Sequence, residues 1–165
     1  MAEPRILHIF KAGGVVTAIT IDDIDRELIR ALQADGRASY SQLSRLVGLS
    51  DAACRQRVMR LLDERVIDIV AVTDPAKLGL NYQALLGITV NNDVRKIASK
   101  IENFDDAVYI VMSTGRFDLL VELVSRDRDR FVEISNDIRI MRGVTGVEVM
   151  SYLGITKQTY DWGVG

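Results

Sequence analysis

The sequence predicts an α+β protein, in which a helical N-terminal unit is followed by a C-terminal βαββαβ unit of the ferredoxin-like type. Two observations support this prediction. Apolar residues recur every three or four positions up to about residue 65, whereas strand-like and helical stretches alternate beyond residue 82. The 165 residues suffice for two small domains, and the 48% hydrophobic content supplies apolar surface for a core in each.

The composition excludes several classes of protein. A single cysteine, Cys54, leaves no disulfide framework, and we predict it to be a packed core thiol. The one histidine, His8, lies near the N-terminus, so no histidine-ligated metal site or internal Ser-His-Asp triad is possible. No phosphate-binding glycine motif is present. We expect no enzymatic activity and no cofactor; the competing enzyme hypothesis is a small oxygenase-like activity on the C-terminal unit.

The chain divides into four segments by composition and pattern. Segment 1–20 is an N-terminal extension that lacks the features of a signal peptide, because an acidic residue comes first and the apolar stretch is short. The helical unit covers 21–74, a linker with one Pro and one Gly covers 75–81, and the βαββαβ unit covers 82–165. No stretch has transmembrane length, and we expect a cytoplasmic protein.

Three helices are predicted in the N-terminal unit. The first covers about 23–34, the second runs from Ser41 to Gly48, and the third runs from Ser50 to about Arg65. A two-turn helix, a short break that contains glycine and a longer helix form a helix-turn-helix arrangement. In that arrangement the second of the two helices enters the major groove of DNA.

The third predicted helix has one apolar face and one basic face. From Arg37 to Arg65 there are six arginines and three acidic residues, in a chain whose formal net charge is −2. Such a local positive charge suits DNA phosphates, although an amphipathic helix with outward arginines is more commonly a solvated face. The residues predicted to contact DNA are Arg37, Ser50, Ala52, Ala53, Arg55, Gln56, Arg57 and Arg60.

Beyond the linker the pattern predicts four strands and two helices. The strands are 82–90, 108–113, 117–124 and 147–155, and the helices are 94–104 and 127–141. This βαββαβ order places both helices on one face of the sheet. Upstream of the linker, the β-branched stretch 66–73 predicts a short strand, or wing, after the third helix.

The second and third strands of the C-terminal unit carry apolar residues at both alternating sets of positions. Both faces of the sheet therefore need to be buried, but two helices on one side cover only one face. We predict that the other face packs against a second copy of the chain in a homodimer.

Several stretches also match a known two-domain pattern. In the N-terminal unit they are Asp22–Arg26, Leu32–Arg37, Leu43–Ser50, Cys54, Arg57-Val58 and Arg60-Leu61, and in the C-terminal unit Thr114–Asp118. These stretches resemble the winged helix-turn-helix and the ligand-sensing domain of the Lrp/AsnC (feast/famine) transcription regulators. The resemblance covers about residues 21–157.

The resemblance implies a regulator that binds double-stranded DNA, forms a homodimer that assembles to a tetramer or octamer, and senses an amino acid or related small molecule. It places the effector site in the turn between the second and third strands, at Met112, Thr114, Gly115, Arg116, Phe117 and Asp118. Gly115-Arg116 would hold the effector's carboxylate, and Asp118 its ammonium group. Alternatively, Gly115 only turns the hairpin and Asp118 caps it. An architectural DNA-wrapping protein without a functional effector site is the alternative function.

Two positions depart from the family pattern. Asp51 stands where many members have proline in the first turn of the recognition helix, and Arg65 stands where glycine commonly precedes the wing. Neither departure breaks the predicted fold, since aspartate is favourable at a helix N-terminus.

Overall fold

The computed structural model describes residues 19–159, so most of the predicted extension and the end of the predicted C-terminal unit lie outside the described residues. The described chain divides into two compact units, with the boundary between Ala71 and Val72. The predicted linker 75–81 follows this boundary and contains the short 3₁₀ helix η1 (Ala76–Leu78). The last two described residues, Gln158 and Thr159, belong to the first unit in this division.

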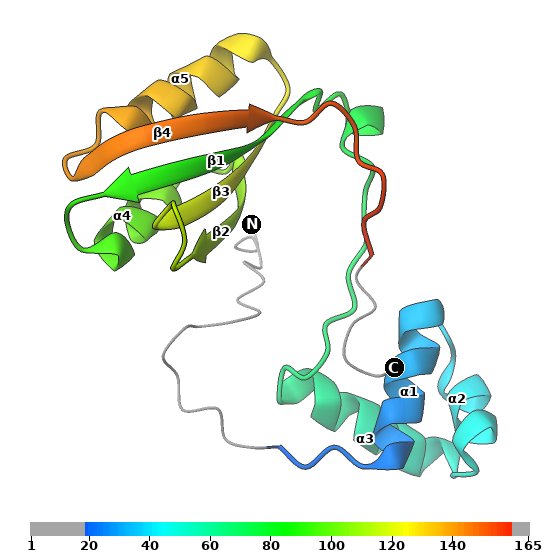
Figure 1. The fold of residues 1–165 in the computed structure, drawn as a ribbon. Coiled ribbons are helices and arrows are strands. Elements are labelled where there is room, and N and C mark those ends of the chain that lie inside the picture. The colour runs from blue at the N-terminus through cyan, green and yellow to red at the C-terminus, as the bar shows by residue number, and fades with distance from the viewer. Residues whose placement is uncertain (1–18, 160–165) are drawn as a thin grey trace. The chain divides into compact units, whose positions relative to one another are not determined.

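The described part of the first unit contains the helices α1 (Asp23–Ala34), α2 (Tyr40–Val47) and α3 (Asp51–Asp63), labelled in Figure 1. Their apolar faces meet in a small core. Leu28 of α1, Leu43 of α2, and Cys54 and Val58 of α3 are all buried there. Cys54 is thus the packed core thiol that the sequence predicts.

Helix α2 begins earlier than the sequence analysis predicts. Ser41 lies within the helix, and the N-cap is Ser39, whose Oγ accepts a hydrogen bond from the Gln42 N–H at 3.3 Å. The Ser39 N–H in turn donates to Gln42 Oε1 at 2.8 Å, which completes a capping box. At the other end Gly48 has a φ of 69°, a left-handed conformation that glycine adopts without strain.

The end of α3 requires the same left-handed conformation from a residue with a side chain. The Val66 N–H donates to the Leu61 carbonyl at 2.8 Å and the Arg65 N–H donates to the Leu62 carbonyl at 3.1 Å, which is the Schellman motif. Arg65 has a φ of 55° and is the only non-glycine residue with positive φ among residues 19–159. Its departure from the family's glycine therefore costs free energy, since the left-handed region disfavours residues with a Cβ.

The predicted wing strand 66–73 is absent, and that prediction was wrong. The segment is irregular, and the side chains of Ile69, Val70 and Val72 are exposed. Its β-branched residues favour an extended backbone. A strand also needs a neighbour for its N–H and C=O groups, and none of the described segments pairs with it.

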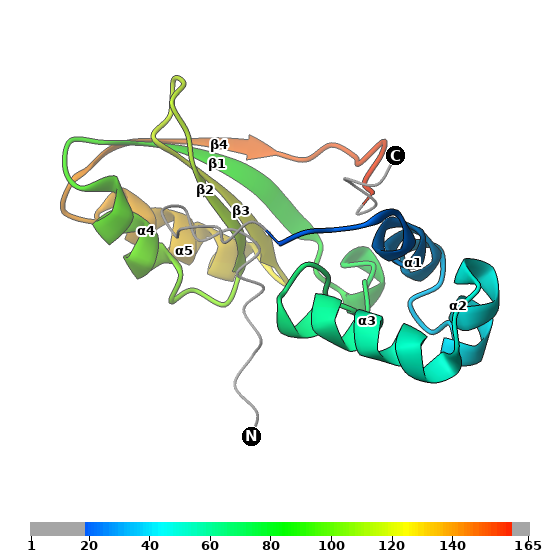
Figure 2. The same cartoon turned by 90° about the horizontal axis from the view of Figure 1, so that it is seen from below.

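The second unit has the predicted βαββαβ order. Its elements are β1 (Tyr82–Val90), α4 (Val94–Ile101), β2 (Ala107–Met112), β3 (Leu119–Ser125), α5 (Arg128–Arg139) and β4 (Val144–Ser151). All neighbouring strands are antiparallel, in the order β2-β3-β1-β4. Strand β4 begins before Gly146, because Val144 already pairs with Val90. In Figure 2, α4 and α5 lie on the same face of the sheet, as predicted.

The two faces of this sheet differ in burial. On the helix-facing side, the buried side chains of β1 and β3 meet those of α4 and α5; this core includes Ala84, Leu86, Ile88, Ile97, Ile101, Leu119, Val121, Leu123, Ile134 and Ile138. The register places Leu85, Leu120 and Met150 on the opposite face. The edge strand β2 leaves Val108 and Tyr109 more than half exposed. Apolar residues therefore occupy both faces, but the described helices cover only one.

Candidate nucleic-acid interface and effector site

Helix α3 presents three different faces. The side chains of Cys54, Val58 and Leu61 point into the core of the first unit. Two half-buried arginines, Arg57 and Arg60, are directed toward α1. The exposed side chains between Ser50 and Arg60 are those of Asp51, Ala52, Arg55, Gln56 and Met59.

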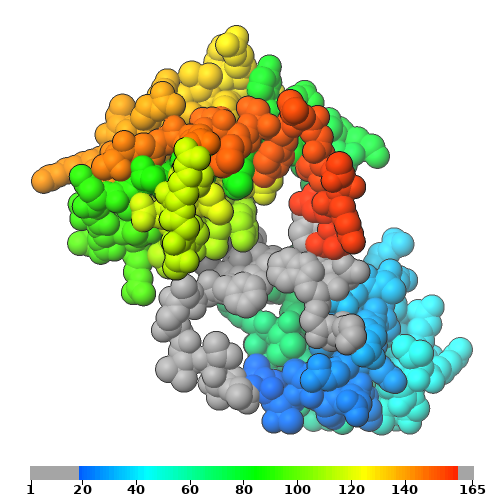
Figure 3. Space-filling model, in the orientation of Figure 1, coloured from blue at the N-terminus to red at the C-terminus, as the bar shows by residue number. Residues whose placement is uncertain are grey.

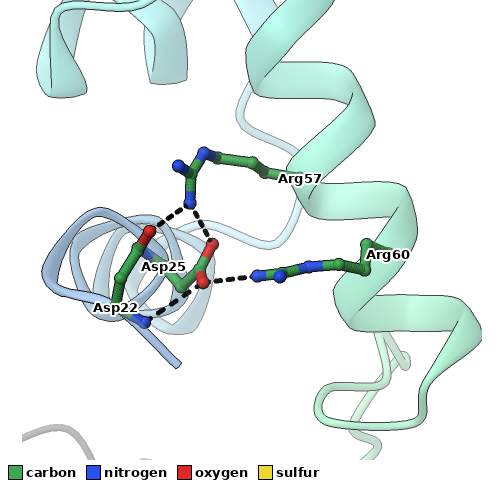
Figure 4. A network of polar contacts seen from close by, with 4 residues as sticks. All are labelled: Asp22, Asp25, Arg57 and Arg60. Atoms are coloured by element: carbon green, nitrogen blue, oxygen red, sulfur yellow. Dashed lines mark hydrogen bonds and ion pairs between the residues drawn. The ribbon is translucent and has the colours of Figure 1, made fainter. Parts of the chain in front are cut away.

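Arg57 and Arg60 tie α3 to α1 through a network of ion pairs, shown in Figure 4. The Arg57 Nη1 donates to Asp22 Oδ2 at 2.7 Å and to Asp25 Oδ1 at 2.9 Å. Arg60 Nη2 donates to the second carboxylate oxygen of Asp25. Two acidic residues three positions apart, the N-cap of α1 and a residue in its first turn, therefore meet two arginines three positions apart on α3.

The centre of this network is a buried carboxylate. The Asp25 side chain is only 1% exposed, and a buried charge is tolerated only when it is paired and hydrogen-bonded. Asp22 serves both as the N-cap of α1 and as a partner of Arg57. The Asp25 N–H, followed by the Arg57 guanidinium, lowers the pKa of the Asp22 carboxyl. The hydrogen bond to Asp22 likewise raises the pKa of Arg57.

The structure separates the four long polar side chains of α3 that are predicted to contact DNA. Arg55 and Gln56 are exposed, whereas Arg57 and Arg60 are turned toward α1. The matching three-residue spacings of the acids on α1 and the arginines on α3 are a signal for this arrangement. Sequence periodicity alone does not show which face of α3 the first helix occupies.

A shallow hollow of about 560 Å³ lies along the exposed face of α3. It is lined by Tyr40, Asp51, Ala52, Arg55, Gln56 and Met59. Three of these residues, Tyr40, Asp51 and Met59, are not among the DNA contacts that the sequence predicts. For Met59 the signal is the helical spacing, since positions 52, 55, 56 and 59 form one stripe.

The remaining residues predicted to contact DNA lie near this face or in the turn between α1 and α2. Ser50 is the N-cap of α3, and its Oγ accepts a hydrogen bond from the Ala53 N–H at 3.2 Å. Ala53 is half buried. Arg37 is exposed, and its N–H donates to Asp35 Oδ1 at 2.9 Å.

In the second unit, the turn between β2 and β3 is held by hydrogen bonds within the chain. Asp118 Oδ2 accepts from the Val90 N–H at 2.8 Å, and the Asp118 N–H donates to the Ile88 carbonyl at 2.9 Å. The Ser113 hydroxyl donates to the Phe117 carbonyl. The Asp118 carboxylate therefore joins the turn to β1, which is close to the capping role considered as the alternative.

Arg116 and Phe117 fold back over the sheet. Arg116 Nη2 is 2.7 Å from Glu148 Oε2 of β4, and its guanidinium lies 5.2 Å from the centre of the Phe117 ring. Gly87 of β1 permits the close approach of that ring, because a Cβ at this position would lie 2.5 Å from a ring carbon. Figure 3 shows the turn in yellow-green in front of β4 in orange.

The other three residues of the predicted effector site are exposed. Met112 ends β2 with 38% of its surface exposed, and Thr114 and Gly115 form the tip of the turn. The site residues thus lie together in one turn, with Arg116 and Asp118 already paired inside the chain.

Neither a cluster of metal ligands nor a membrane-spanning helix occurs in the part of the chain that the structure describes. Residues 19–159 contain no group of three or more His, Cys, Asp and Glu side chains placed to hold a metal ion. None of the helices in the same range is long and apolar enough to cross a membrane.

The helix-turn-helix with its exposed recognition helix, joined to a separate α+β unit, defines the class of two-domain transcriptional regulators. The sequence matches the AsnC-type helix-turn-helix domain over residues 21–62 and the Lrp/AsnC ligand binding domain over residues 83–162. The chain belongs to the Lrp/AsnC family of transcriptional regulators.

Curated relatives support this assignment. The proline dehydrogenase transcriptional activator of Rhizobium radiobacter is 34% identical over 145 residues, which cover 83% of this chain and 85% of the relative. The HTH-type transcriptional regulator FL11 of Pyrococcus furiosus is 29% identical over 143 residues, 86% of this chain and 95% of the relative.

Solved structures share the fold. A transcriptional regulator from Neisseria meningitidis, solved as an L-Met complex, has a TM-score of 0.79 and 23% identity, with coverage of 88% of this chain and 97% of that one. AsnC of E. coli has a TM-score of 0.77 and 22% identity, with coverage of 87% and 99%.

Proposed function

We propose that this protein is a sequence-specific DNA-binding regulator that binds roughly palindromic sites as a homodimer, or as a tetramer or octamer built from such dimers, and responds to an amino acid or related small molecule. The observation that carries the DNA-binding proposal is the exposed stripe of α3, which presents Ala52, Arg55 and Gln56 on a helix-turn-helix. Arginine pairs with the edge of guanine, and glutamine pairs with the edge of adenine.

The other predicted DNA contacts take different parts in this proposal. Arg37 reaches the phosphate backbone from the turn before α2, and the small Ala52 and Ala53 after the Ser50 cap let the start of α3 approach the groove. Arg57 and Arg60 act mainly as positioning residues, because their guanidinium groups are paired with Asp22 and Asp25.

This division is tested by measuring DNA affinity at several salt concentrations with Arg55→Ala and Arg57→Ala. We expect Arg55→Ala to weaken binding to the specific site by about 1–3 kcal/mol while binding to unrelated DNA changes little. Arg57→Ala should lower the stability of the first unit, with equal effects on specific and unrelated DNA. A larger loss of sequence discrimination in Arg57→Ala than in Arg55→Ala would contradict the division.

The amino-acid response is supported by the ligand-binding domain of the family and by the L-Met complex of the Neisseria regulator. In this chain the turn from Met112 to Asp118 is the proposed site. We infer that Arg116 exchanges its ion pair with Glu148 for the carboxylate of the effector, because that pair is exposed and exposed pairs contribute little free energy. Backbone N–H groups at Thr114 and Gly115 complete the carboxylate site.

Thermal unfolding in the presence of each of the twenty amino acids tests this proposal. A ligand present at 100 times its dissociation constant stabilises the folded state by about 2.7 kcal/mol. We expect a raised Tm with one or a few amino acids, a loss of that shift in Arg116→Ala, and an equal or larger shift in Glu148→Gln, which frees Arg116.

A second candidate function is an architectural DNA-wrapping regulator without a working effector site. The specific observation in its favour is that both charged residues of the predicted site are already paired, Arg116 with Glu148 and Asp118 with the backbone of Val90. An unchanged Tm with all twenty amino acids, together with weak dependence of DNA binding on sequence, would favour this function.

The homodimer proposal rests on the sheet face that the described helices leave uncovered. Leu85, Leu120 and Met150 lie on that face by register. Analytical ultracentrifugation should give a dimer or a larger assembly for the wild type and a smaller species for Leu120→Arg. Val132→Arg, on an exposed position of α5, is the matched control and should not change the assembly. A monomeric wild type would contradict the proposal.

A further inference from the structure

We propose that Met59 and Tyr40 form an apolar wall that contacts the C5-methyl group of a thymine in the major groove, and so determine part of the DNA sequence preference. This inference rests on the proposed function, because it needs α3 to lie in the groove. It adds a hydrophobic element to the polar contacts assigned to Arg55 and Gln56.

The first observation is the exposure of an apolar side chain on the recognition helix. Met59 is 40% exposed, although its neighbours Val58 and Leu61 on the same helix are buried in the cores of the first unit. Its place in the stripe of positions 52, 55, 56 and 59 puts it on the face of α3 that also carries Arg55 and Gln56. Among the described residues, Met59 belongs to neither of the buried clusters of the first unit.

The second observation is that Met59 lies beside Tyr40. The Tyr40 hydroxyl lies 4.0 Å from the Met59 sulfur, across the two helices of the helix-turn-helix. Tyr40 itself packs against the buried cluster that contains Leu43 and Val58. The ring of Tyr40 is therefore anchored, and together with Ala52 it lines the hollow beside Met59.

The chemistry of the major groove indicates what this wall contacts. Base edges in the groove display hydrogen-bond donors and acceptors, and the only apolar group among them is the thymine methyl. A methyl group that enters the hollow would be removed from water against the Met59 thioether and the Tyr40 ring. Arg55 and Gln56 line the same hollow, so we expect the thymine to lie next to a base pair that they contact.

The test uses uracil, which differs from thymine only by the missing methyl group. The preferred site is first selected from random double-stranded DNA with the full-length wild-type protein, and each thymine in it is then replaced by uracil in turn. We expect at least one symmetric pair of replacements to weaken wild-type binding by about fourfold per half-site, the effect of one buried methyl group.

Variants then assign this effect to the wall. In Met59→Ala the uracil and thymine sites should bind within about twofold of each other, whereas Met59→Leu and Tyr40→Phe, which keep the apolar surface, should still prefer thymine. Leu46→Ala is the matched control, because Leu46 is an exposed apolar residue on α2 that does not line the hollow. It should keep the full preference for thymine.

The outcomes separate this inference from the proposed function. A selected site that tolerates uracil at every position, or a thymine preference that survives in Met59→Ala, would overturn the apolar wall and leave sequence-specific binding intact. Loss of the thymine preference in Tyr40→Phe would also overturn it, since a polar contact of the hydroxyl would then be responsible. Failure to select any preferred site would overturn the proposed function and this inference together.

Discussion

The two units of this protein are stabilised in different ways. In the first unit a small apolar core is supplemented by the ion-paired carboxylate of Asp25, which is buried between α1 and α3. In the second unit the larger core is apolar, and the buried polar side chains described there are the uncharged ones of Ser125 and Ser135.

This difference shows how the recognition helix is positioned. Three short helices bury little apolar surface, so specific ion pairs fix how α3 lies against α1. The arginines that look most like DNA ligands in the sequence are therefore partly used to build the unit itself. In the second unit, the sheet and its two helices bury enough apolar surface that the fold does not depend on the polar residues of the β2–β3 turn.

The largest effect should come from removing the central carboxylate of the first unit. Asp25→Ala leaves the guanidinium groups of Arg57 and Arg60 without their shared partner, and we expect a loss of about 2–3 kcal/mol, reduced by the partial exposure of both arginines. Urea unfolding monitored by circular dichroism measures it. Glu27→Ala, at an exposed position of the same helix, should change stability by less than about 0.5 kcal/mol. Equal losses of stability in Asp25→Ala and Glu27→Ala would show that the buried ion pairs do not stabilise the first unit.

The second unit should respond instead to a change in packing. A methyl group at Gly87 would collide with the Phe117 ring, so Gly87→Ala should cost about 1–2 kcal/mol. Gly115→Ala, in open space at the tip of the turn, should be nearly neutral. A double-mutant cycle with Phe117→Ala in urea unfolding should recover most of the loss. An undiminished loss in the double variant would show that the ring is not the cause.

A smaller effect in the opposite direction is expected at the end of α3. Arg65→Gly relieves the left-handed backbone at a φ of 55°, partly offset by the greater freedom of glycine in the unfolded chain, and should stabilise the protein by about 0.5–1 kcal/mol. Thermal unfolding measures this gain. Arg65→Ala retains the Cβ, so its Tm should not rise in the same way. A gain from alanine as large as that from glycine would assign the effect to the lost charge.

The smallest effect concerns the dependence of stability on pH. The pKa of Asp22 is lowered from 3.8, so its contribution is fully present above about pH 4 and is lost as the pH falls through the lowered value. Asp22→Asn keeps the N-cap but removes the charge that pairs with Arg57. We expect the Tm difference between wild type and Asp22→Asn to be constant from pH 7 to about pH 5 and to shrink below pH 4. A difference that does not change down to pH 3 would show that the charge has no part in it.

Local sequence patterns predicted most of the secondary structure. The range of α1 and that of β1 follow from spacing and capping residues, and the βαββαβ order follows from the alternation of periods. These features depend on interactions within a few residues, which the sequence displays directly. The N-cap of α2 was placed at Ser41 rather than Ser39, because serines at both positions offer the same local signal and only Gln42 distinguishes them.

Features that need a distant partner could not be predicted in the same way. The stretch 66–73 has the composition of a strand, but the described chain provides no neighbouring strand for it. The same holds for the candidate sites. The sequence predicted which segments carry them, namely α3 for DNA and the β2–β3 turn for the effector. The packing of α1 decided that Arg57 and Arg60 turn inward, and the packing of α2 placed Tyr40 beside Met59. The sequence thus determined which residues are polar, apolar or able to cap, whereas only the tertiary structure decided which of them remain exposed, because exposure depends on what packs against each face.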